Sequence, residues 1–514
     1  MVPGTWVPAA PVGGPTSAPA SSDDASTPWA RGFASEISRL RSRGVTYAQS
    51  ADFLREIVRR ASLRFTDIRD DPRRFFLAHR LLAAQAPAHG PGFWIRFTVQ
   101  FNLFAGTVVA LGGPAHLRRL DAIQAAGELG CFCLTERLAG VNSGLVVNTT
   151  ASYDPASRTF VLRSPNEGAC KNWISQGLTA EWAVVVADLT TGGRRVGPHG
   201  FLVRLRDARD GPARRGVTVG DMGEKTTGVD LDNAWVRFTE CRVPHECLLD
   251  RHGGVDAATG AYVTRGAEKN AKKPMEMIGQ RLFTGRVAVA QAALVFSRAL
   301  FAKTRQYSDG KMCAMRGATP GLSDVPQLRA LYDEADARFA RMESFAEACE
   351  TELCAALASD APPPPAATRA IAVAKIRAVE TCVELCHRLK QEVGSYALMA
   401  DTGFEHTDFL QCCKFAEGDS RILSQKLARD AFGEWLRHQQ SGTKRPPLGW
   451  SSEETRACAR IAAAVRTAEG RGASKIQAWD AAWRDVYALA DAACARAISE
   501  TLGETLGETL DAKL

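Results

Sequence analysis

The amino-acid sequence predicts an α+β multidomain protein: an N-terminal helical bundle, a middle antiparallel β-barrel-like domain, and a C-terminal helical bundle with a short extra helical region. Apolar residues repeat at helical spacing up to about residue 130 and again after residue 275. Between them lie short β-branched and aromatic runs, separated by Gly, Pro and Asp. A chain of 514 residues is expected to form two to four packing units.

The N-terminal part divides in two. Residues 1–28 are rich in Pro, Ala, Gly and Ser and contain no Lys or Arg, so they lack the basic region of a secretory signal and the Arg-rich character of a transit peptide. We expect a disordered arm there. Residues 29–130 are expected to form the N-terminal helical domain, with Phe53, Ile57 and Val58 on one helix face.

Residues 131–252 are expected to form the middle β-domain, with strand-like runs at 145–149, 160–162 and 182–186. A glycine-containing connector should follow at 253–266.

Helices are expected again in residues 275–441, the C-terminal helical domain, where Pro362–Pro365 separates two of them. After a proline-containing linker, residues 451–514 should form a short second helical region of two helices and a targeting tail. The tail contains a Leu-Gly-Glu-Thr duplication at 502–509.

Composition narrows the class of protein. The net charge of +7 is modest and would favour anionic substrates, and arginines are scattered rather than clustered, which argues against a nucleic-acid binder. No apolar run approaches the roughly 18–20 residues of a membrane span, so none is expected. The fourteen cysteines show no zinc spacing; we expect reduced thiols, an intracellular protein and no metal.

Three short segments concentrate residues suited to chemistry. The first, Gly130–Gly144, ends an apolar run in Thr135 and continues into a turn with Asn142 and Ser143; its small hydroxyl groups and free amides suit a flat polar heterocycle. The second, Lys171–Gly177, places an indole beside a hydroxyl group. The third, Phe415–Ser420, places a carboxylate before glycine. Each segment alone is compatible with an ordinary turn or core element.

In this order the three segments resemble the motifs of the acyl-CoA oxidase and acyl-CoA dehydrogenase superfamily: F-x-L-T-E, K-x-W-I-S/T-x-G and E-G-D/E-N-T. The resemblance covers residues 71–429 and is closest to the peroxisomal acyl-CoA oxidase branch, through segments such as 71–76, 199–203 and 220–223. The superfamily has the same helical, β, helical order, whereas oxidases append a longer second helical region than this chain has.

The resemblance implies FAD as cofactor and Glu417 as the catalytic base. Removing two hydrogens from adjacent carbons requires a carboxylate with a raised pKa and a hydride acceptor, and no side chain accepts hydride. The resemblance places Thr135, Trp173 and Ser175 beside the flavin, with Ser143 also assigned to the cofactor. It leaves Asn142 and Gly418 for the substrate. Read locally, Glu417 could instead be a capping acid and Trp173 a core aromatic residue.

Other cofactor contacts match the family less closely. Arg305 and Gln306 resemble an R-x-Q-F element that reaches the FAD diphosphate across a dimer interface, but Arg305 directly precedes Gln306. Gly394 stands where the family often has a glycine pair, and Ser420-Arg421 replaces the usual Asn-Thr.

The function that these residues favour is an acyl-CoA oxidase of fatty acid β-oxidation: a fatty acyl-CoA would become trans-2-enoyl-CoA, and molecular oxygen would become hydrogen peroxide. A dehydrogenase passing electrons to an electron-transfer flavoprotein and a non-catalytic scaffold paralogue remain open. The resemblance implies a homodimer. The final Ala512-Lys513-Leu514 is a variant of the Ser-Lys-Leu peroxisomal address, so we expect recognition by a peroxisomal import receptor; a mitochondrial or cytoplasmic location is the alternative.

Overall fold

The structure is a computed structural model of the chain. It describes residues 26–39, 45–141, 143–265, 274–314, 319–442, 447 and 449–504, with backbone only for 274–281. Asn142, most of the expected N-terminal arm and the Ala512-Lys513-Leu514 tripeptide lie outside the described residues, as does the Leu-Gly-Glu-Thr duplication beyond residue 504.

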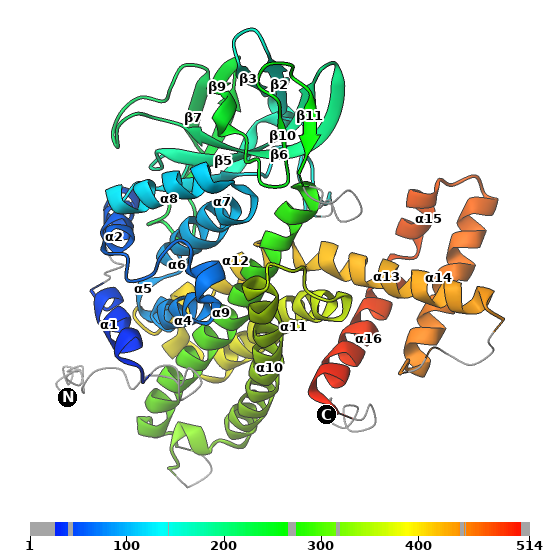
Figure 1. The fold of residues 1–514 in the computed structure, drawn as a ribbon. Coiled ribbons are helices and arrows are strands. Elements are labelled where there is room, and N and C mark those ends of the chain that lie inside the picture. Colours follow the sequence, from blue (N-terminus) through cyan, green and yellow to red (C-terminus); the bar gives the residue numbers. More distant parts are fainter. Residues whose placement is uncertain are drawn as a thin grey trace.

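Short helices form the N-terminal part (Figure 1). Their starts carry recognisable caps: Thr46 and Gln49 form a capping box on α2, and Asp71 accepts from the Arg74 amide where Pro72 opens α4. The helices are α1 Pro28–Ile37, α2 Tyr47–Arg60, α3 Asp67–Asp70, α4 Pro72–Ala83, α5 Ala86–His89, α6 Gly92–Thr98, the π-helix η1 Val99–Ala105, α7 Gly106–Leu111 and α8 Pro114–Ala126.

The middle of the chain forms a curled β-structure that caps one end of the helices (Figure 1). One sheet has the order β1-β5-β2-β3-β9 with β6 also on β5, another has the order β4-β8-β7, and β10-β11 is a hairpin within the expected connector. The strands are β1 Gly130–Cys133, β2 Thr150–Asp154, β3 Thr159–Arg163, β4 Lys171–Ser175, β5 Trp182–Thr191, β6 Arg194–Arg204, β7 Val217–Asp221, β8 Asn233–Phe238, β9 Cys241–Pro244, β10 Gly253–Val255 and β11 Tyr262–Thr264. Most pairings are antiparallel, but β5 pairs in parallel with β1 and β2.

Long helices form the C-terminal part, and α9, α10 and α11 pack together below the β-structure (Figure 1). The helices are α9 Pro274–Gly310, α10 Pro326–Ala358, α11 Pro365–Glu392, α12 Phe409–Phe415, α13 Ser420–Gln440, α14 Ser452–Gly470, α15 Lys475–Ala481 and α16 Trp483–Leu502. One apolar cluster joins residues of all three parts, and a smaller one holds α13, α14 and α16 together. The predicted fold class, helical then β then helical, is confirmed.

Three local expectations differ from the structure. Residues 145–149 are irregular and β2 begins at Thr150, because the Glu136 carboxylate binds the amides of Asn148 and Thr149, which are then not free to pair with another strand. Within 451–504, the described part of the last region, there are three helices rather than two. Finally, two helical stretches among the described residues, 92–111 and 282–310, are long and apolar enough to cross a membrane. However, 89% and 72% of an 18-residue apolar segment in each are buried inside the protein, as in core helices.

Candidate functional site

Glu417 lies in the short loop between α12 and α13, and its side chain is buried. The loop turns sharply: Glu417 has φ +57° and Gly418 has φ +93°, a region that glycine adopts easily and glutamate rarely. Asn102 of the π-helix donates from Nδ2 to Glu417 Oε1 at 3.3 Å. Among the described residues, neither Glu417 Oε2 nor Asn102 Oδ1 has a hydrogen-bond partner, although both atoms are buried. A buried polar atom without a partner is costly and often marks a functional site.

Burial dominates the electrostatics of this carboxyl group. Desolvation raises the pKa of Glu417 to about 7, while Arg286 and Lys375 act in the opposite direction. Arg286 donates from Nε to the Glu417 carbonyl oxygen at 3.0 Å, and burial lowers its own pKa to about 10. Near neutral pH the carboxyl group can therefore both hold and release a proton, which is what a general base requires.

Lys375 of α11 binds the loop that carries Glu417. Its Nζ donates to the carbonyl oxygens of Lys414 and Gly418, the latter at 2.9 Å, and to Ser420 Oγ at 3.1 Å. These acceptors flank Glu417 on both sides, so one ammonium group fixes the loop from the end of α12 to the start of α13. Burial lowers the pKa of Lys375 to about 7.

Sequence reasoning missed Asn102, Arg286 and Lys375. A signal existed for Lys375, since it is the one charged residue in the apolar run Ile371–Ile376 and a buried lysine needs partners. Asn102 and Arg286 come close to Glu417 only through the packing of η1 and α9 around the loop, which no spacing in the sequence reveals.

A second group of predicted residues meets on the β-structure. The Asn172 amide donates to the Thr135 carbonyl oxygen at 2.9 Å, which brings the end of the first motif beside the second. The register of β4 shifts between Lys171 and Ile174. Within this bulge Trp173 has φ +57°, and 57% of the residue is exposed. The alternative interpretation of Trp173, a core aromatic residue, is therefore wrong. Thr135 is also exposed.

A buried ion pair supports this surface from below. Lys171 Nζ lies 2.9 Å from Glu136 Oε1, and both side chains are fully buried. Lys171 also donates to the carbonyl oxygens of Leu134 and Val186. The charges are thus multiply hydrogen-bonded, as an ion pair in a protein interior must be.

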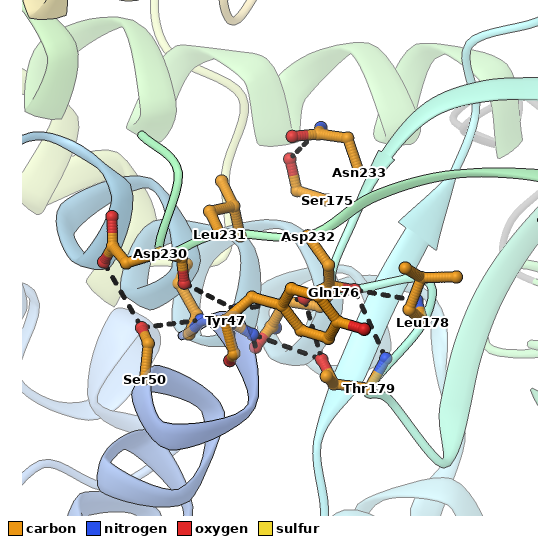
Figure 2. A network of polar contacts seen from close by, with 12 residues as sticks. Tyr47, Ser50, Ser175, Gln176, Leu178, Thr179, Asp230, Leu231, Asp232 and Asn233 are labelled. Atoms are coloured by element: carbon orange, nitrogen blue, oxygen red, sulfur yellow. Dashed lines mark hydrogen bonds and ion pairs between the residues drawn. The ribbon is translucent and has the colours of Figure 1, made fainter. Parts of the chain in front are cut away.

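Arg96 joins the helical part to the β-structure through a polar network, and Figure 2 labels its partners Ser50, Thr179 and Asp232. Its guanidinium group is fully buried and donates to Ser50 Oγ, Thr179 Oγ1 and the Asp232 carboxylate, the last at 3.0 Å. Asp232 in turn accepts from the backbone amides of Leu178 and Thr179. The ends of β4 and β8 are thereby fixed, and next to them Asn233 donates from Nδ2 to Ser175 Oγ at 3.1 Å (Figure 2).

The remaining cofactor candidates form a third group, at the end of α9 and after α11. Tyr307 stacks on Tyr396 with ring centroids 3.7 Å apart, which brings Arg305 and Gln306 near Gly394. Arg305 pairs with Asp336 at 3.0 Å and covers the Tyr332 ring; Gln306 and Gly394 are exposed.

Ser143 is exposed. Its hydroxyl group accepts from the Gly140 amide and donates to the Gly140 carbonyl oxygen within the same turn. Among the described residues no hydrogen bond connects the three groups around Glu417, Trp173 and Arg305.

Comparison with known proteins agrees with this architecture. No family model matches the chain. Over 209 residues it is 34% identical to peroxisomal acyl-coenzyme A oxidase 3 of Homo sapiens, covering 39% of this chain and 28% of the relative. Over 360 residues it is 28% identical to acyl-coenzyme A oxidase 2 of Yarrowia lipolytica, covering 66% and 50%. These alignments span about a quarter to a half of the relatives' length.

Solved structures extend the likeness to the fold. The acyl-CoA oxidase-2 of Caenorhabditis elegans, solved with FAD, ascaroside-CoA and ATP, superposes with a TM-score of 0.74 at 19% identity, covering 92% of this chain and 75% of that one. The glutaryl-CoA dehydrogenase of Mycobacterium smegmatis gives a TM-score of 0.60 at 16% identity, covering 78% and 94%. The resemblance to the acyl-CoA oxidase and acyl-CoA dehydrogenase superfamily, and within it to the oxidase branch, is therefore confirmed in both sequence and fold.

Proposed function

We propose that this chain is an FAD-dependent acyl-CoA oxidase, which converts a fatty acyl-CoA to a trans-2-enoyl-CoA and reduces molecular oxygen to hydrogen peroxide. The observation that carries the proposal is Glu417: a buried carboxyl group with a pKa of about 7 and an oxygen atom without a partner among the described residues. A capping acid at a helix start would be solvated, and its hydrogen bonds to the helix amides would favour the anion and lower its pKa.

In this proposal Glu417 removes the proton next to the thioester carbonyl group. Its free Oε2 is the atom available to take that proton, while Asn102 holds Oε1 in place. Arg286 and Lys375 fix the loop through its backbone, so the carboxylate is oriented before substrate arrives.

The thioester oxygen needs a donor, because negative charge develops on it as the proton leaves. The backbone amide of Glu417 is suited to this role, since it has no acceptor among the described residues. Gly418, next in the loop, keeps its assignment to the substrate as a proposal; its φ of +93° is one that glycine adopts easily. Asn142 keeps its assignment to the substrate as a proposal.

The second group of residues fits a flavin. Exposed Trp173, exposed Thr135 and the hydroxyl group of Ser175 offer an aromatic face and short donors on one rigid surface, which is what a flat heterocycle requires. FAD, when bound, supplies the hydride acceptor that the protein lacks. We also assign Ser143 to the cofactor.

Arg305, Gln306 and Gly394 are assigned to the cofactor of the partner subunit in a homodimer. The exposure of Gln306 and Gly394, and the separation of all three residues from the other two groups, support contacts across an interface rather than within one chain. An arginine already paired with Asp336 would keep only part of its guanidinium group for a phosphate.

A dehydrogenase that passes electrons to an electron-transfer flavoprotein is the second candidate. One observation favours it: this chain covers 94% of the glutaryl-CoA dehydrogenase structure but only 75% of the C. elegans oxidase structure. The intact surroundings of Glu417 argue against the third candidate, a non-catalytic scaffold paralogue.

The test is to purify the full chain, measure bound FAD, and assay peroxide with butyryl-CoA, palmitoyl-CoA and a branched acyl-CoA as substrates. Peroxide formed in proportion to enoyl-CoA supports the oxidase. Enoyl-CoA formed only with an added electron-transfer flavoprotein would establish the dehydrogenase, and a chain that retains no FAD would overturn both.

We further propose a peroxisomal location, since relatives such as the human oxidase are named peroxisomal. Fluorescent fusion of the chain at its N-terminus, with and without Ala512-Lys513-Leu514, tests it. Colocalisation with a peroxisomal marker that depends on the tripeptide supports the proposal, and a mitochondrial or cytoplasmic signal contradicts it.

A further inference from the structure

A short chain of hydrogen bonds leads from Lys225 to the hydroxyl group of Ser175. Lys225 Nζ donates to Asn233 Oδ1 at 2.6 Å, and Asn233 Nδ2 donates to Ser175 Oγ at 3.1 Å. Ser175 and Asn233 are partners in the pairing of β4 with β8, so the contact between their side chains is fixed by the sheet register. Figure 2 shows the two side chains facing each other, next to the Arg96 network.

The direction of these bonds follows from chemistry. An ammonium group only donates, so the side of the Asn233 amide that faces Lys225 must be the oxygen. The NH₂ group then faces Ser175, and Ser175 Oγ must accept. A hydroxyl group that accepts in this way keeps its own hydrogen for another partner. Among the described residues none accepts that hydrogen.

The lysine itself is held in place. It also donates to the Leu231 carbonyl oxygen, in the segment that the Arg96 network anchors through Asp230 and Asp232. Burial lowers the pKa of Lys225, Arg96 adds to that effect, and Asp232 and Asp230 oppose it. The surrounding carboxylates thus help to keep the ammonium group charged.

We infer that Lys225 and Asn233 are positioning residues that orient the Ser175 hydroxyl group as a hydrogen-bond donor towards the flavin ring. The inference rests on the proposed function, since it requires FAD beside Ser175. A donor to the ring stabilises the electron-rich reduced flavin more than the oxidised one, so the relay raises the reduction potential of the bound cofactor.

The substitution Asn233→Asp tests the relay with almost no change of shape. One carboxylate oxygen can still pair with Lys225, but the other turns an acceptor towards Ser175 and captures its hydrogen. The added charge would also lower the flavin potential, so Asn233→Asp is measured in the wild-type background and in Ser175→Ala. If the relay exists, Asn233→Asp lowers the potential by about 30 mV, a tenfold change in the redox equilibrium of a two-electron couple, in the wild-type background. In Ser175→Ala the shift falls to less than half.

Two further comparisons separate positioning from general damage. Lys225→Met should reproduce part of the potential shift seen in Asn233→Asp. Lys225→Arg should keep the wild-type potential, because arginine keeps a charged donor. Asn166→Asp is the matched control: its exposed side chain accepts from the Ala169 amide, which a carboxylate does equally well. It should leave the potential unchanged.

The potentials are measured by anaerobic reductive titration with a reference dye, without acyl-CoA. Equal shifts from Asn233→Asp in both backgrounds, or no shift, would overturn the relay while leaving the proposed function intact. A wild-type chain that binds no FAD would overturn the proposed function and the relay together.

Discussion

The α carbon of Gly285 in α9 lies against the carboxyl group of Glu417, so closely that a Cβ added to Gly285 would overlap the carboxylate carbon and both of its oxygens. Glycine here provides space rather than backbone freedom. Together with Asn102, which donates to Glu417 Oε1, it defines where the carboxylate can lie.

Gly285→Ala should therefore displace Glu417 and lower kcat/KM by at least 100-fold, because a shift of about 1 Å in a reacting group can cost that much. Helix propensity alone would make alanine favourable. Gly433→Ala in α13 is the matched control, since only the end of the Arg437 side chain lies near that site. Steady-state kinetics with an acyl-CoA substrate measure kcat/KM for both variants. Equal activity of the two variants would contradict the assigned position of the base.

Glu417→Gln should stabilise the protein at pH 8 while abolishing turnover. Folding raises the pKa of Glu417 from 4.5 to about 7, so the folded state binds the extra proton between these values and loses stability as pH rises through them. The penalty above pH 7 is about 3 kcal/mol. Thermal unfolding should show a rise in Tm that is large at pH 8 and small at pH 5. Glu347→Gln, an exposed glutamate, serves as control, and a Tm gain independent of pH would refute the raised pKa.

The rate of the half-reaction should fall as pH drops below about 7, since Glu417 must be ionised to act as a base. Lys375 favours the carboxylate, and its own pKa is also about 7, so the two groups titrate together. Lys375→Gln removes the cation, and the acidic limb of kcat/KM should move to higher pH. An unmoved limb in a folded variant would mean that Lys375 serves only to hold the loop.

The ion pair of Lys171 and Glu136 should matter for stability rather than for chemistry. Lys171→Met leaves the Glu136 carboxylate buried and unpaired, at an expected cost of about 3–5 kcal/mol. Adding Glu136→Gln removes that charge and should recover part of the loss, because the amide oxygen can still accept from Asn148 or Thr149. Urea unfolding measures both. A double variant as unstable as Lys171→Met would show that lost hydrogen bonds, not the buried charge, set the cost.

The order of helical and β parts could be predicted from the sequence, because the spacing of apolar residues changes near residues 130 and 275. It also singled out Glu417 and Trp173, whose exceptional backbone angles the structure then revealed. Residues 145–149 were misread as a strand, since β-branched composition does not show that Glu136 captures two of the amides.

What the sequence could not reveal depends on contacts between distant segments. Asn102 and Glu417 are 315 residues apart, and no local pattern links them. The same holds for Arg96, which reads as an ordinary helix arginine yet is fully buried among acceptors from three segments. Long-range polar networks of this kind follow from packing, not from spacing.

The most direct measurement is anaerobic mixing of the purified protein with palmitoyl-CoA or butyryl-CoA, following the visible absorbance of bound flavin, with Glu417→Gln alongside. If Glu417 is the base, the wild-type flavin bleaches on mixing and the flavin of the variant stays oxidised although acyl-CoA still binds. A colourless wild-type protein, or a variant that bleaches as fast as wild type, would contradict the account.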